Sequence, residues 1–143
     1  MEIQPNENAP RENKRPVLLT VLCVLTFIGS GLGAFSNLLI TTSYEETMAL
    51  LEETEHNFPL IDMFMKAGYG FFLTGTILYS TSLLGALQMW KLRKIGFHFY
   101  FVSQILIIIL PLVYIEGYPA PYLDVAITAL FVWLYYRHLP LMR

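Results

Sequence analysis

Three polar side chains interrupt otherwise apolar stretches of the chain and are the first candidates for chemistry: Asn37, Gln104 and Asp124. Burying an amide or a carboxylate in lipid is costly without a partner or water, so such residues often mark ion or substrate paths. An amide at this depth also commonly joins two helices by a hydrogen bond, which is the interpretation we favour for Gln104. Asp124 falls in the first turn of an expected helix, where the helix dipole favours a carboxylate. Of the three, only Gln104 is expected near the middle of a membrane.

No residue set reproduces a known catalytic or metal-binding pattern. His98 and His138 fall near the same ends of two antiparallel helices, an arrangement that can ligate haem, but His138 is expected at the membrane surface beside Arg137. Cys23 is the only cysteine, which excludes an internal disulfide and a CxxC redox pair. Phosphate-binding, HExxH and GxSxG motifs are absent. We therefore expect no enzyme activity, no cofactor and no metal.

Long apolar segments must position these side chains. The chain of 143 residues is 55% hydrophobic and only 14% charged, which is typical of a protein whose solvent is lipid. A helix of about 20 apolar residues crosses the roughly 30 Å of hydrocarbon in a bilayer. The pattern predicts an all-α integral membrane protein, a four-helix transmembrane bundle whose membrane domain covers residues 16–139. Its spans are expected at about 17–40, 67–90, 96–114 and 122–139.

Charged residues are sorted between the two ends of these spans. Eight of the nine Lys and Arg residues flank the spans in clusters, whereas acidic residues concentrate in the loop 41–66. Because short loops rich in Lys and Arg stay in the cytoplasm, we expect both termini inside and this loop outside. Residues 1–15 are predicted to be a disordered cytoplasmic tail, and 140–143 a short cytoplasmic C-terminus. Ser43 followed by Glu46 is a capping-box pattern, which predicts a short amphipathic helix in the outer loop.

Small residues indicate where helices approach one another, since close backbone contact replaces the hydrophobic drive that lipid cannot supply. Two residues of the first span have the small-xxx-small spacing, and the second span carries a similar stripe. The packing candidates are Gly29, Gly33, Gly75, Ser82 and Ala86. Gly33 and Gly75 fall at nearly equal depth, so the first two spans are expected to pack there. Contact with another copy of the chain is the alternative.

Interaction is the first functional interpretation, because no catalytic set is present. We expect an accessory, scaffolding or interaction subunit of a membrane complex, or a homo-oligomer, that contacts lipid and no nucleic acid. The alternative is a small oligomeric transporter or channel using Gln104 and Asp124. The layout resembles that of the small multidrug exporters, but those depend on a glutamate in the first span, where this chain has no acidic residue. Compact loops, no signal peptide and no cysteine-rich outer loop favour a bacterial inner membrane.

Overall fold

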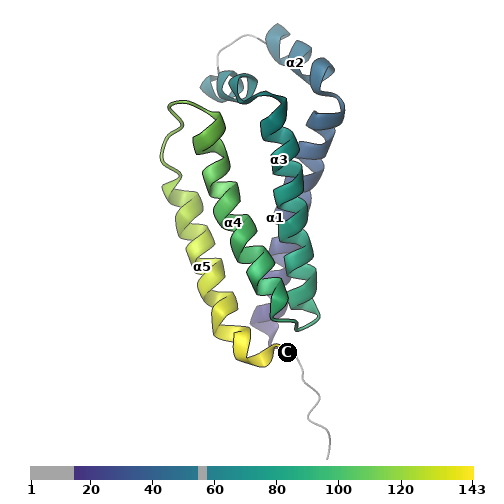
Figure 1. Ribbon diagram of the computed structural model, residues 1–143, viewed down its shortest axis with the longest axis vertical. Helices are drawn as coiled ribbons and strands as arrows, with labels where there is room; N and C mark the ends of the chain where they lie inside the picture. The colour runs from purple at the N-terminus through teal and green to yellow at the C-terminus, as the bar shows by residue number, and fades with distance from the viewer. Residues whose placement is uncertain (1–14, 55–57) are drawn as a thin grey trace, which may run out of the picture.

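The chain forms helices joined by short connections. The computed structural model describes residues 15–54 and 58–143, so the tail predicted at 1–15 lies, apart from Arg15, outside the described residues. The all-helical class predicted from the sequence is confirmed for the described residues. Five α-helices and a closing 3₁₀ turn follow one another (Figure 1): α1 (Val17–Thr42), α2 (Tyr44–Glu53), α3 (Pro59–Trp90), α4 (Ile95–Tyr114), α5 (Tyr122–His138) and η1 (Leu139–Leu141).

Three of these helices are long and apolar enough to cross a membrane: α1, α3 from Ile61 to Trp90, and α4. Large apolar side chains cover their outer surfaces, as in Leu32, which is 62% exposed, and Ile77, which is 59% exposed. Such a surface is stable against lipid and would be unfavourable against water. The three helices therefore indicate a membrane location. At 17 residues, α5 is shorter than the other three.

The two ends of the bundle carry opposite charge. The start of α1, the turn between α3 and α4, and the end of the chain lie together at one end (Figure 1). We call this the basic end, because it carries Arg15, the turn with Lys91, Arg93 and Lys94, and Arg143. At the opposite, acidic end lie α2 and the connection between α4 and α5. The sorting of charge seen in the sequence is thus a sorting in space.

The acidic end contains more helix than the sequence predicted. Pro59 starts α3, and at Gly68 the backbone turns with φ 74° and ψ 171°, a conformation essentially restricted to glycine. The part of α3 before this kink lies across the acidic end, and the part after it runs along the bundle (Figure 1). The expected short helix is present as α2. Its predicted capping box is wrong, because the Ser43 side chain makes no cap hydrogen bond. The backbone N–H of Ser43 donates to the Leu39 carbonyl of α1 over 3.0 Å.

A tight turn at the basic end joins α3 to α4 and holds the end of the chain. Leu92 takes a left-handed conformation with φ 58°, and the N–H of Arg93 donates to the Gln88 carbonyl over 2.9 Å, which is the bond pattern of a Schellman C-cap. The chain end is fixed to this turn by two backbone hydrogen bonds. Arg143 N–H donates to the Leu92 carbonyl over 2.7 Å, and Lys94 N–H donates to the Arg143 carbonyl over 2.8 Å.

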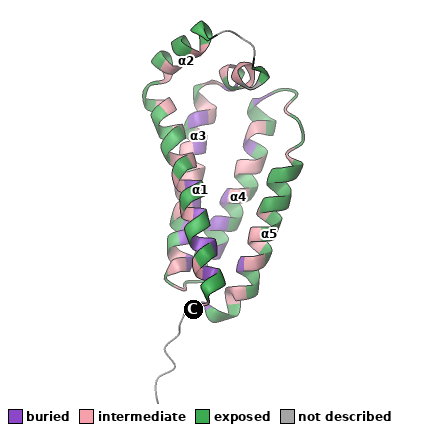
Figure 2. Cartoon of the chain, turned by 180° about the vertical axis from the view of Figure 1, so that it is seen from behind, coloured by how far each residue is buried: buried purple, intermediate pink, exposed green. Residues whose placement is uncertain are grey.

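The best-packed part of the bundle lies toward the basic end. All buried residues of α1 fall between Leu19 and Ser30, toward the basic end, and Tyr135 is the buried residue of α5 (Figure 2). Met142, beyond the last helix, is also buried. These residues belong to a cluster that draws on α1, α3, α4, α5 and the chain end: Leu19, Leu22, Cys23, Met89, Phe97, Tyr100, Tyr135 and Met142.

Glycine allows the closest helix contact, which is between α3 and α4. A Cβ placed on Gly96 would stand 2.5 Å from the Gly85 carbonyl oxygen and 2.6 Å from the Met89 nitrogen, and both of these atoms belong to the backbone. The sequence analysis did not select Gly85 or Gly96. The selected residues Ser82 and Ala86 are fully buried on α3. The α3–α4 hairpin therefore depends on the absence of side chains at one crossing point.

The glycines chosen from the sequence have three different surroundings. A Cβ on Gly33 would meet the Tyr79 ring at 2.5 Å, and one on Gly75 would meet Asn37 Oδ1 at 2.6 Å. Both glycines thus lie in the α1–α3 contact, but each faces a side chain and not the other glycine. Gly29 has no atom within 4 Å of its Cβ position, so it belongs to no helix contact within the described residues.

We expect Gly96→Ala to lower the melting temperature of the purified protein in detergent. Overpacking against backbone atoms, which cannot move aside, costs roughly 1–3 kcal/mol. Gly31→Ala is the matched control, because it adds the same methyl group to a helix where nothing lies within 4 Å. Equal melting temperatures for the two variants would contradict the contact.

Candidate functional site

A cavity of about 660 Å³ lies between α5 and the three longer helices. It forms because α5 is held at the basic end and separates from the bundle toward the acidic end. From Tyr122 to Ile127 every residue of α5 is exposed, whereas Tyr135 is fully buried. The cavity volume falls within the range of roughly 300–1,000 Å³ that is usual for small-molecule sites.

Hydrogen bonds close the floor of the cavity. Gln104 Nε2 of α4 donates to Ser82 Oγ of α3 over 3.1 Å, and Ser82 shares a second hydrogen bond of 2.8 Å with Ser30 of α1. The interhelical bond expected of Gln104 is therefore present. A second polar contact lies nearer the basic end, where the hydroxyls of Thr26 and Tyr135 are 2.8 Å apart. These five side chains, from all four helices, thus pair with one another, as burial of polar groups in lipid requires.

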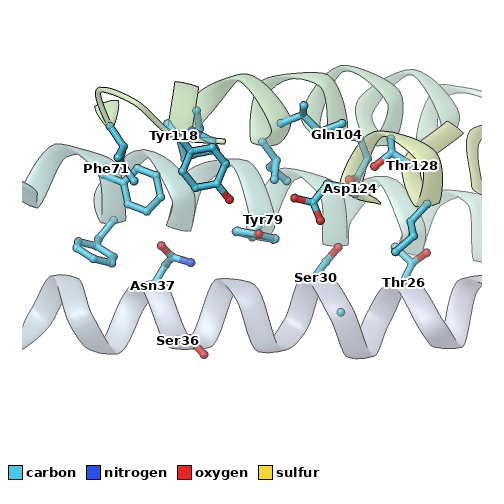
Figure 3. A pocket seen from close by; sticks show the side chains of 18 of the residues that line it. Thr26, Ser30, Ser36, Asn37, Phe71, Tyr79, Gln104, Tyr118, Asp124 and Thr128 are labelled. Atoms are coloured by element: carbon cyan, nitrogen blue, oxygen red, sulfur yellow. The ribbon is translucent and has the colours of Figure 1, made fainter. Parts of the chain in front are cut away.

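Asp124 points from α5 into the cavity, opposite Ser30 and Asn37 of α1 (Figure 3). Along the bundle axis its carboxylate lies level with Ser30 and Gln104 in this view, deeper than its position in the sequence suggested. The reason is that the connection 115–121 runs back along the bundle before α5 begins (Figure 1). A carboxylate expected near the surface thus lines the same cavity as the glutamine expected near the middle of the membrane.

Among the described residues, no cation forms an ion pair with Asp124. Tyr79 of α3 lines the same cavity, and both Asp124 and Tyr118 interact with it electrostatically. Asn37 also lines the cavity, and its Nδ2 donates to the Gly33 carbonyl of its own helix over 2.8 Å. The three polar residues selected from the sequence therefore line one cavity, on three different helices.

Aromatic side chains form much of the remaining wall, and the sequence analysis did not assign them to a site. They come from α3, α4 and α5 and from the connection before α5. Phe71 and Phe72 are in contact edge to face, with ring centroids 5.3 Å apart. In an apolar helix an aromatic residue gives no signal of which face it occupies, so only the fold brings this set together. The aromatic lining consists of Phe64, Phe71, Phe72, Tyr79, Tyr100, Tyr118 and Phe131.

His98, His138 and Cys23 lie outside the cavity lining. His98 Nδ1 is 3.3 Å from the Lys94 carbonyl oxygen, and His138 Nδ1 is 2.7 Å from the Leu134 carbonyl oxygen, so each pairs within its own helix. Cys23 is buried in the core cluster with Tyr135. In the part of the chain that the structure describes, no three His, Cys, Asp or Glu residues come close enough to hold a metal ion.

No protein-family model matches this chain, and no curated protein sequence or solved structure is significantly similar to it. A function must therefore be derived from the chain's own surfaces. Two of them are distinctive: the cavity beside α5, and the lipid-facing side of α1.

We expect Ser82→Ala to destabilise the bundle by roughly 1–2 kcal/mol, because it removes the hydroxyl that joins Gln104 and Ser30. The melting temperature in detergent measures this loss. Thr81→Ala is the control, since Thr81 donates to the Ile77 carbonyl of its own helix over 2.8 Å and joins no second helix through that bond. A Ser82→Ala protein as stable as the control would show that the network contributes nothing.

Proposed function

We propose that the chain crosses a bacterial inner membrane four times, with α5 as the fourth span and both termini in the cytoplasm. The sorting of Lys and Arg to one end of the bundle supports this orientation, because short basic segments stay in the cytoplasm. The connections between the helices are compact, and the acidic end carries Glu45, Glu46, Glu52 and Glu53 on α2. The single cysteine lies within α1 and not in a loop.

The position of the chain end supports a crossing by α5. If α4 runs from the basic end to the acidic end, a helix joining its far end back to Arg143 has to return across the bilayer. Its 17 residues extend about 25 Å at 1.5 Å per residue, slightly less than the hydrocarbon core. Local thinning of the bilayer accommodates such a difference at small cost.

We expect single cysteines introduced into a Cys23→Ser background to label according to this topology. Glu52→Cys and Glu116→Cys, both at exposed positions of the acidic end, should react with a membrane-impermeant maleimide on intact cells. Arg93→Cys and Arg137→Cys should react only after the membrane is permeabilised. Labelling of residues 52 and 93 from the same side would overturn the orientation, and labelling of 116 and 137 from the same side would overturn the fourth crossing.

We propose that the protein acts as an accessory or interaction subunit of a membrane complex. The observation that carries this proposal is a stripe of residues on the lipid-facing side of α1, spaced alternately by four and three positions. At its centre stands Gly31, where no atom lies within 4 Å of the Cβ position. The other members are large and exposed: Val24, Ile28, Phe35 and Leu38.

This spacing places all five residues on one side of a helix, so a second helix can lie along them. A glycine at the centre lets the two backbones approach closely, which is the main source of association between helices in lipid. Within the described residues Gly31 takes part in no helix contact of the bundle, in contrast to Gly33, Gly85 and Gly96. A helix of another membrane protein is the occupant we propose for this stripe.

We expect Gly31→Leu to reduce recovery of partner proteins at least tenfold when the tagged chain is isolated from its native membranes after crosslinking. The added side chain keeps a second helix away, while the bundle itself has room for it. Ala129→Leu is the control, since it introduces the same side chain at an exposed position on α5. Recovery of the same partners with Gly31→Leu, or of no partner with the wild type, would contradict the proposal.

A small transporter or channel is the second candidate, because Asn37, Gln104 and Asp124 line one cavity. A carrier of this architecture would first have to bind its substrate beside Asp124. A channel would need a continuous path to the basic end, where the side chains of Tyr100 and Tyr135 are buried and in ring contact at 5.1 Å. That contact favours a carrier over a channel.

A further inference from the structure

We propose that the cavity beside α5 binds a hydrophobic organic cation carrying a single positive charge, with Asp124 as its counter-ion. A protonated or quaternary amine bearing apolar groups is the chemical class. The cavity is a separate place from the α1 stripe, so this inference does not rest on the proposed interaction role.

The charge of the lining sets the charge of the ligand. Asp124 is the carboxylate among the described residues that line the cavity, and none of the described Lys, Arg or His residues lines it. An ionised carboxylate at this depth is costly unless a positive charge comes close to it. Asp124 lies in the first turn of α5, where the positive end of the helix dipole attracts a carboxylate but supplies no full counter-charge. A bound monovalent cation would form the ion pair that the Asp124 carboxylate needs.

The side chains that line the cavity favour an organic cation over a metal ion. A metal such as Mg²⁺ or Ca²⁺ binds through several oxygen ligands, usually including more than one carboxylate. The cavity offers one carboxylate with the amide side chains of Asn37 and Gln104, amid a mostly aromatic and aliphatic surface. Aromatic faces attract organic cations through the ring quadrupole, most strongly where water is excluded. Tyr79, which lines the cavity together with Asp124, can contribute in this way.

The size of the cavity agrees with this class. A volume of about 660 Å³ is far larger than one ion and its ligands need, and it suits a compact molecule with several apolar groups. Gln104 is already bonded to Ser82, so the floor is held in place before a ligand enters. The exposed outer half of α5 gives a route from the lipid or the acidic side. A cationic amphiphile would concentrate at that acidic end by charge attraction.

Equilibrium dialysis of tetraphenylphosphonium against the purified full-length protein in uncharged detergent tests this site. Micelles without protein serve as the blank, and tetraphenylborate is the probe of matched shape and opposite charge. We expect saturable binding of the cation, at least tenfold tighter than any binding of the anion. Asp124→Asn should weaken cation binding at least tenfold, and Tyr79→Leu severalfold, with retained gel-filtration profiles.

Glu116→Gln is the matched control, because this exposed carboxylate lies in the connection before α5 and does not line the cavity. It should bind the cation as the wild type does. Thr128→Phe, one turn beyond Asp124, fills part of the cavity without removing charge and should also weaken binding, which keeps the test decisive if Asp124→Asn fails to fold. Equal affinity for both probes, or unchanged binding in a folded Asp124→Asn or Thr128→Phe protein, would overturn the inference. Partner recovery through Gly31 would be unaffected by any of these results.

Discussion

The attachment of α5 at one end only is the constraint on which the rest of the molecule depends. Tyr135 is fully buried, bonds Thr26 over 2.8 Å and packs its ring on Tyr100, while the backbone of Arg143 is bonded to the α3–α4 turn. Nothing comparable holds the first two turns of α5. One end of the helix is therefore fixed and the other diverges, which opens the cavity and turns Asp124 toward its centre. A fourth helix packed along its whole length would have no cavity beside it.

Lipid as the solvent explains why the other three helices are held in a different way. Apolar burial gives little net drive between helices already surrounded by hydrocarbon, so contact must come from close packing and from polar groups that satisfy one another. The α3–α4 hairpin uses the first means at Gly85 and Gly96, and α1, α3 and α4 share the second through Ser30, Ser82 and Gln104.

Hydropathy alone predicted the positions of the long helices, because a run of apolar residues bounded by charge has one stable arrangement in a bilayer. The predicted ends at residues 17, 90, 114 and 122 coincide with helix ends in the structure. The kink at Gly68 was missed, since a glycine with positive φ has no pattern of its own. So was the left-handed Leu92, because the C-cap it forms usually has glycine in that place. The depth of Asp124 depends on the path of residues 115–121, and no periodic pattern of apolar residues in the sequence predicts that path.

The three glycines of α1 show where inference from spacing reaches its limit. Gly29 and Gly33 share a motif, yet Gly33 meets Tyr79 while Gly29 lines the cavity, and Gly31 between them faces outward with no neighbour. Successive positions on a helix differ by about 100°, so residues two apart point to nearly opposite sides. One helix thus supplies a bundle contact, a cavity wall and a lipid-facing stripe within a single turn and a half. Because the stripe and the cavity lie on different sides of α1, a partner helix bound at Gly31 would leave the space beside Asp124 open to a ligand.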